Sequence, residues 1–179
     1  MADESRQTVL IPLFEQLLPL VPALTEKLEQ GIEVLDVGCG SGFALIEMAK
    51  EFPKSRFTGY DMSIEAIQSG RKKTREYGLK NIELERRDVA NFNTKQKYDL
   101  ITTFDAVHDQ AYPDRLLTNI FAALKDDGVY FMQDIAGSSQ VQQNMEHPIA
   151  PFLYTISCMH CMTVSLSQNG KGLGAMWGK

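Results

Sequence analysis

The sequence predicts an α/β fold, namely a doubly wound, mostly parallel sheet with helices on both faces. Short apolar segments alternate with segments whose apolar residues have helical spacing, and this alternation is typical of a parallel sheet. The first short segment also runs straight into a glycine-rich turn that opens a helix. With 179 residues and 44% hydrophobic content, the chain is long enough for one globular domain.

The elements follow one another in a regular order. Strands are expected over residues 32–37, 56–61, 82–85, 98–104 and 129–132. Residues 9–28 predict one or two helices broken near three prolines, and further helices are expected over 43–52, 63–77, 113–124 and 149–162. Gly128 is expected to close the turn before the last strand. The run 163–166 alternates like a short strand.

The glycine-rich turn is the clearest functional signal. Gly38, Gly40 and Gly42 permit positive φ and let a ligand approach the backbone closely. Such turns bind dinucleotides, nucleoside triphosphates and adenosine-containing cofactors alike. The carboxylate of Asp36 would repel a pyrophosphate and attract a cation. Phe43 stands where a dinucleotide fingerprint has its third glycine, and no Gly-Lys-Ser/Thr ending is present.

A second acid, Asp61, ends the second predicted strand roughly 20 residues after the glycine turn. A carboxylate at this point can accept hydrogen bonds from both hydroxyls of a ribose. By itself Asp61 would be an acid at the start of the next helix, which Ser63 caps and Gly78 ends. Together with Asp36 and the glycines, the ribose role is favoured.

These residues in this order resemble the class I S-adenosylmethionine-dependent methyltransferases, over about residues 31–134. The resemblance implies S-adenosylmethionine as the cofactor. In that family an acid after the third strand bonds the adenine amino group and the next residue packs on the ring, and Asp88 and Val89 match these positions. Alone, Asp88 would be an ordinary loop acid. The residues expected to bind the cofactor are Asp36, Gly38, Cys39, Gly40, Gly42, Asp61, Met62, Asp88, Val89 and Phe104.

The fourth predicted strand ends at a sequence that reads DAVHD, in the crevice where open α/β sheets bind their ligands. The family members that methylate base amines or glutamine amides carry an Asn/Asp-Pro-Pro-Tyr/Phe motif here, and this chain does not. His108 and Asp109 are the candidate catalytic residues, because His108 could take a proton from a substrate hydroxyl. A structural His108 that caps the next helix is an equally good interpretation, and methyl transfer often needs only alignment of its two partners.

The resemblance implies an enzyme that moves a methyl group to an O, N or C nucleophile of a small molecule. The alternative is a non-catalytic cofactor-binding or regulatory module, and a dehydrogenase is a distant third. The chain is also similar to the methyltransferase half of proteins that carry a winged-helix domain in front. It divides into a helical leader (1–30), a cofactor-binding core (31–135) and a helical segment with a glycine-rich tail (136–179). The last two strands usual in this fold are missing, so a truncated protein is expected.

In the strand order typical of the fold, 3-2-1-4-5, the fifth strand becomes an open edge. We expect a homodimer or a swapped tail to cover it, because apolar edges are rarely left bare. The run 163–166 is the local candidate for pairing with it.

Composition excludes several other partners. The net charge of −5 argues against nucleic acid, and the basic cluster at residues 71–75 is a solvated helix face. No apolar run approaches the roughly 20 residues of a membrane span, and the N-terminus lacks a signal peptide, so a cytoplasmic location is expected. The cysteines number three, and this odd count without a signal peptide indicates reduced thiols rather than disulfides. Cys158 and Cys161 with His160 invite a zinc interpretation, but no second ligand pair follows, and no metal is expected.

Overall fold

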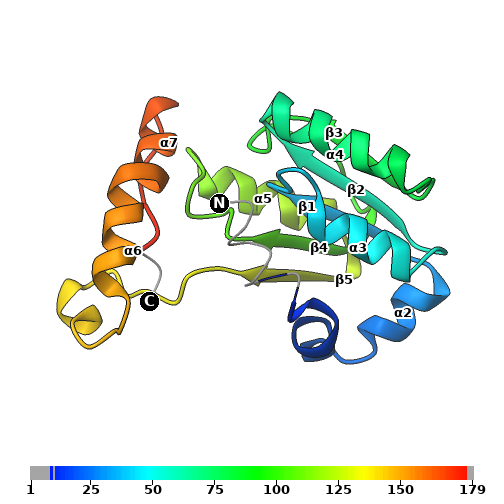
Figure 1. The fold of residues 1–179 in the computed structure, drawn as a ribbon, viewed down its shortest axis with the longest axis horizontal. Helices are drawn as coiled ribbons and strands as arrows, with labels where there is room; N and C mark the ends of the chain where they lie inside the picture. The colour runs from blue at the N-terminus through cyan, green and yellow to red at the C-terminus, as the bar shows by residue number, and fades with distance from the viewer. Residues whose placement is uncertain (1–8, 10, 177–179) are drawn as a thin grey trace.

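A five-stranded sheet forms the centre of the protein in a computed structural model that describes residue 9 and residues 11–176 (Figure 1). The strand order is β3-β2-β1-β4-β5, and every neighbouring pair is parallel. The strands are β1 (Glu33–Val37), β2 (Arg56–Asp61), β3 (Ile82–Arg86), β4 (Tyr98–Phe104) and β5 (Leu124–Gln133). The predicted fold class and strand order are confirmed.

Helices cover both faces of the sheet, because successive strand residues point to opposite sides. Val34 and Leu100 belong to a core with the leader, α3 (Phe43–Glu51) and α4 (Ile64–Glu76). Leu35 and Ile101, their sequence neighbours, belong to a second core that α5 (Pro113–Ala123) closes. This two-sided burial is the doubly wound arrangement that the sequence predicted.

Each helix boundary that could be predicted has a local cause. Ser63 caps α4, its hydroxyl accepting a hydrogen bond from the backbone N–H of Ala66 at 3.1 Å. Pro113 is the first residue of α5, where its missing N–H costs nothing. Gly31, with φ of 109°, ends the leader helix α2 (Leu24–Gln30).

The leader is irregular before α2, as its prolines predict. It contains a π-helical turn at Leu13–Leu17 and a 3-10 turn at Leu18–Leu20. Residues 1–8 and 10 of the predicted leader, and residues 177–179 of the tail, lie outside the described residues.

The last strand is longer than the sequence suggested. The predicted boundary placed residue 124 in a helix and Gly128 in a turn. In the structure α5 ends at Ala123 and β5 already begins at Leu124, with a register shift opposite Tyr98 to Leu100. Gly128 therefore lies inside the irregular part of a strand, where a Cβ would come 3.0 Å from the Tyr98 carbonyl oxygen.

The tail contradicts the prediction of a strand-like run at 163–166. The tail begins with a 3-10 turn (Val141–Asn144). After it, α6 (Ala150–Ile156), a π-helical turn (Ser157–Cys161) and α7 (Met162–Ser167) follow one another without a break. These helices stand beside the sheet rather than on its edge (Figure 1). The alternation was misleading because the buried residue is Ser165, whose hydroxyl donates to the Gln110 carbonyl at 3.0 Å, while Leu166 is exposed.

Among the described residues, no helix is long and apolar enough to cross a membrane.

Candidate active site

The glycine turn between β1 and α3 forms one end of the site. Gly38, Gly40 and Gly42 have φ angles of 79°, 55° and 71°, which other residues rarely adopt. A Cβ at Gly38 would also lie 2.6 Å from the Cβ of Ala106. The N–H of Gly38 donates to the Tyr60 carbonyl at 2.8 Å, which ties the turn to β2. At Gly40 a Cβ would meet nothing within 4 Å, so the backbone there is open to a ligand.

Asp61 at the end of β2 holds this turn in place. One carboxylate oxygen, Oδ2, accepts a hydrogen bond from the N–H of Gly40 at 2.8 Å, and Oδ1 accepts one from the N–H of Ser63 at 2.8 Å. Each oxygen has a second lone pair, so both can still accept a hydrogen bond from a ligand hydroxyl. Asp61 therefore links the glycine turn to the position predicted for a ribose.

Asp36 is a buried carboxylate on the same side of the sheet. The Thr102 hydroxyl donates to its Oδ1 at 2.8 Å, and the residue is 3% exposed. Burial raises the pKa of Asp36 to about 7, and the charge of Asp61 adds to this effect while the hydrogen bond from Thr102 opposes it. A bound cation would lower the free energy needed to ionise Asp36.

A cavity of about 750 Å³ lies over the carboxyl ends of the strands. Asp36 and Asp61 line it together with the glycine turn. Opposite them, Asp109 and Gln110 come from the loop after β4, and His160 comes from the tail. One cavity thus connects a cofactor cradle with a second group of polar side chains.

His108 lies just behind that second group, 3% exposed. Its Nδ1 is 2.5 Å from Oδ1 of Asp134, and its Nε2 is 3.3 Å from Oδ1 of Asp109. Burial by itself lowers the pKa of His108, but the hydrogen bond to Asp134 and the charges of Asp134, Asp109 and Asp105 raise it above the ordinary value. His108 is thus a histidine held between carboxylates.

Asp105 starts the loop with a strained backbone. Its φ of 48° is uncommon for a residue with a side chain, and its N–H donates to the Gln133 carbonyl at 2.9 Å. Burial and the neighbouring charge of Asp134 raise the pKa of Asp105. This conformation turns the chain from β4 into the cavity wall.

The tail closes the cavity on the side away from the glycine turn. His160 and Val164 line it from consecutive turns of the tail helices, and Gln168 lines it from the residue after α7. His160 Nε2 lies 4.0 Å from Oδ2 of Asp109. Gly170 lets the chain after α7 pack against Ala111, since a Cβ there would overlap the Ala111 backbone.

Residues 28–171 match the model of a known protein family, which is described as a methyltransferase domain. The match spans the sheet, the glycine turn and the tail helices. The chain belongs to the class I S-adenosylmethionine-dependent methyltransferases.

The chain is similar to relatives named as N- and O-methyltransferases. It is 29% identical over 109 residues to (S)-coclaurine N-methyltransferase of Papaver somniferum, covering 61% of this chain and 31% of that protein. It is 34% identical over 111 residues to the ubiquinone biosynthesis O-methyltransferase of Actinobacillus pleuropneumoniae serotype 7, covering 59% and 46%. The chain thus spans less than half the length of these two curated relatives.

A solved structure supports the same grouping. PKMT2 from Rickettsia typhi, in complex with AdoHcy, superimposes with a TM-score of 0.58 at 25% identity, and the match covers 79% of this chain and 28% of PKMT2.

The structure brings most of the predicted cofactor residues to the cavity. Those that line it are Asp36, Gly38, Cys39, Gly40, Asp61, Met62, Val89 and Phe104. Gly42 lies behind them at the N-cap of α3, where an added Cβ would overlap the Leu84 side chain. Asp88 is exposed beside Val89 and accepts hydrogen bonds from the Ala90 N–H and the Asn91 side chain. Its contact with adenine stays a prediction.

The two predicted catalytic residues differ in position. Asp109 lines the cavity, whereas His108 is not among the lining residues and sits behind Asp109. Burial and its contact with Asp134 hold the His108 ring in the wall, and proton transfer by His108 stays a prediction.

Sequence reasoning missed Asp134, Asp105 and His160. Asp134 directly follows β5, and its place could have been inferred, since the carboxyl ends of parallel strands meet at one edge of the sheet. Nothing in the sequence places His160, because its position depends on how the tail packs against the loop after β4.

Proposed function

We propose that this chain transfers a methyl group from S-adenosylmethionine to an O, N or C nucleophile of a small molecule. The observation that carries the proposal is the shared cavity, in which Asp36, the glycine turn and Asp61 face Asp109, Gln110 and His160. The names of the relatives, an N-methyltransferase and an O-methyltransferase, support a small acceptor without choosing its atom.

Each cofactor residue has a role that its surroundings support. Asp36 and the backbone of the glycine turn would hold the methionyl part, with the buried carboxylate facing the ammonium. Asp61 would accept hydrogen bonds from the ribose hydroxyls. Val89, Met62 and Phe104 supply apolar surface, and we assign the adenine to the pocket beside Val89 and Asp88.

The bound cofactor supplies an electrophilic methyl group, which a nucleophile takes by in-line displacement while the electron pair of the broken C–S bond returns to sulfur. Asp109 and Gln110 are placed to orient an acceptor through hydrogen bonds. Gln110 is itself fixed, because its Nε2 donates to the Ala106 carbonyl at 2.9 Å. His160 is the lining histidine among the described residues, so it is the side chain placed to accept a proton from an acceptor.

The alternative is a cofactor-binding module without turnover. It is favoured by the described sheet, which ends at β5 and has no further strand to support an acceptor pocket. The two candidates agree on the cofactor and differ only in turnover.

One experiment separates them. Calorimetry with S-adenosylmethionine and S-adenosylhomocysteine measures binding, with NAD as the ligand that should not bind. Transfer of a radiolabelled methyl group to a panel of phenols, amines and thiols then measures turnover, with Asp109→Asn as the test variant. Binding with turnover that falls in Asp109→Asn supports the enzyme. Binding without turnover on any acceptor supports the module, and absence of binding contradicts both.

We also propose a cytoplasmic location and no nucleic-acid partner. The three cysteines are free thiols in the structure, which suits a reducing compartment, and the net charge of −5 disfavours polyanions.

A further inference from the structure

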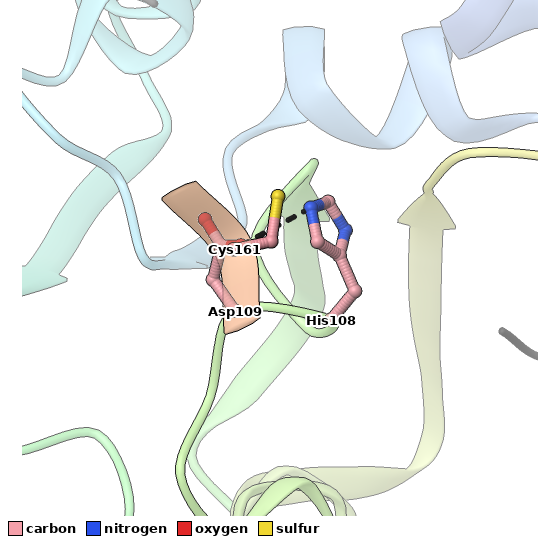
Figure 2. A group of neighbouring side chains, drawn as sticks. All are labelled: His108, Asp109 and Cys161. Carbon is pink, nitrogen blue, oxygen red and sulfur yellow. Dashed lines mark ion pairs between the residues drawn. The ribbon is translucent and has the colours of Figure 1, made fainter. Parts of the chain in front are cut away.

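The side chains of His108, Asp109 and Cys161, all of types that can bind a metal, lie close together (Figure 2), and Asp109 among them lines the cavity. Although no metal was expected from the sequence, we propose that His108, Asp109 and Cys161 bind one divalent transition-metal ion of the zinc class. One ligand atom from each residue lies within 4.8 Å of the other two. His108 and Cys161 are buried, and Asp109 is partly buried. The three come from two segments far apart in sequence, the loop after β4 and the π-helical turn of the tail.

The histidine is oriented as metal-binding histidines are. Its Nδ1 lies against the carboxylate of Asp134 at 2.5 Å, which leaves Nε2 to face Asp109. A carboxylate on the far nitrogen fixes the ring and makes the near nitrogen a better ligand. Asp134 is held in turn by the N–H of Ile135, which donates to Oδ1 at 2.8 Å. Asp134 is therefore the positioning residue of the site.

The carboxylate ligand has an oxygen without a hydrogen bond. Oδ1 of Asp109 is buried and makes no hydrogen bond with the described residues, although it lies 3.3 Å from His108 Nε2. A buried carboxylate oxygen in this state is costly unless a proton on the neighbouring imidazole or a cation satisfies it. A cation between Oδ1 and Nε2 would satisfy it.

The donor set selects the class of metal. A thiolate, an imidazole and a carboxylate together suit zinc better than magnesium or calcium, which prefer oxygen ligands. Three protein ligands leave a fourth tetrahedral position, as in zinc sites that bind a water or a substrate. Asp109 lines the cavity, so that fourth position opens toward the place where the acceptor is expected.

The competing interpretation needs no metal. A proton on His108 could balance the carboxylates of Asp134 and Asp109, and Cys161 would then be an ordinary buried thiol. The two interpretations differ in one observable, a bond between Cys161 sulfur and a metal.

Cobalt(II) tests that bond directly, because it replaces zinc and gives a thiolate-to-cobalt charge-transfer band in the near ultraviolet. The full chain, reduced, free of histidine tag and stripped with a chelator, is titrated with CoCl2. We expect about one equivalent to bind with that band and with the intense visible bands of tetrahedral cobalt, and zinc to displace it. Cys161→Ser should abolish the charge-transfer band.

Cys158→Ser is the matched control, because Cys158 lies in the same helical turn but is exposed. It should keep the band and the affinity. Asp134→Asn should keep the band but weaken cobalt binding about 10- to 100-fold, as expected when the support of a ligand histidine is lost. This variant keeps the proposal testable if Cys161→Ser fails to fold, which circular dichroism would reveal.

Some results would overturn the site. They are the absence of stoichiometric binding, a charge-transfer band that survives in Cys161→Ser, or a band lost in Cys158→Ser. Calorimetry with S-adenosylhomocysteine on the same preparations keeps the proposed function separate. A protein that binds this cofactor product but no cobalt overturns the metal site alone.

Discussion

The carboxylate of Asp61 accepts a hydrogen bond from the backbone N–H of Gly40 at 2.8 Å, across 21 residues of sequence. This bond joins the end of β2 to the glycine turn after β1. The same side chain therefore shapes the turn and faces the predicted ribose. Its loss should affect both the ligand contact and the backbone that cradles the ligand.

Asp61→Ala should weaken binding of S-adenosylhomocysteine by roughly 1.5–3 kcal/mol, the loss typical of hydrogen bonds to a charged group. Asp126→Ala is the control, because Asp126 is an exposed acid at the start of β5 and should change affinity by less than about 0.5 kcal/mol. Calorimetry gives both affinities, and thermal melting checks that each variant folds. Equal affinity of Asp61→Ala and wild type would remove Asp61 from the site.

Cofactor affinity should depend on pH through Asp36. Burial, assisted by the charge of Asp61, raises the pKa of Asp36 to about 7, so below that pH the unliganded site holds a neutral acid. An ammonium binds the carboxylate form, so a proton must leave on binding. Affinity for S-adenosylhomocysteine should therefore rise about tenfold per pH unit up to about pH 7 and level off above it.

Asp36→Asn is the control for that pH dependence. Its amide keeps an oxygen for the Thr102 hydroxyl but cannot titrate. The variant should bind weakly with no pH dependence between about pH 5.5 and 7.5. A wild-type protein whose affinity is flat over this range would show that Asp36 is not the partner of the ammonium.

Gly70→Ala should destabilise the protein although alanine is the better helix former. A Cβ at Gly70 would overlap the carbonyl oxygen of Ser41 and lie 2.5 Å from a methyl group of Leu84. Because the nearest atom belongs to the backbone, the overlap should cost about 3 kcal/mol, the upper part of the usual range, which exceeds the gain of about 1 kcal/mol in helix propensity. Because Ser41 belongs to the glycine turn, cofactor affinity should fall as well.

Gln68→Ala, an exposed change in the same helix, should leave stability and affinity within about 0.5 kcal/mol of wild type. Urea unfolding and calorimetry measure the two quantities. If Gly70→Ala matched Gln68→Ala in both, α4 would have room to move away from the turn.

The open edge of β5 should make the protein self-associate. No strand in the described part of the chain pairs with the outer side of β5, and Met132 on this strand is 48% exposed. The tail provides a helix rather than a strand, so a second copy is the expected partner. Light scattering from low to high micromolar concentration should show a dimer that Met132→Lys weakens, while Met159→Lys on the exposed tail does not. A monomer at every concentration would contradict this.

The sequence by itself determined the sheet and the cofactor end of the site. Asp36 and Asp61 lie at the carboxyl ends of β1 and β2, and the glycine turn follows β1. The apolar patterns of these strands are local, and parallel strands bring their carboxyl ends to one edge. Their neighbourhood in space therefore follows from their positions in the chain. The cap at Ser63 and the start of α5 at Pro113 were predictable for the same reason, because the interactions involved span only a few residues.

Only the tertiary structure decided the acceptor end. The positions of His160 and Cys161 depend on tail helices that are fixed by long-range contacts, such as Ser165 to Gln110 and Gly170 to Ala111. A buried serine and a close-packed glycine have no periodic signature, so the run 163–166 looked like a strand. The place of His108 likewise depends on Asp134, 26 residues away. Such pairings arise from packing between segments, which local sequence patterns do not encode.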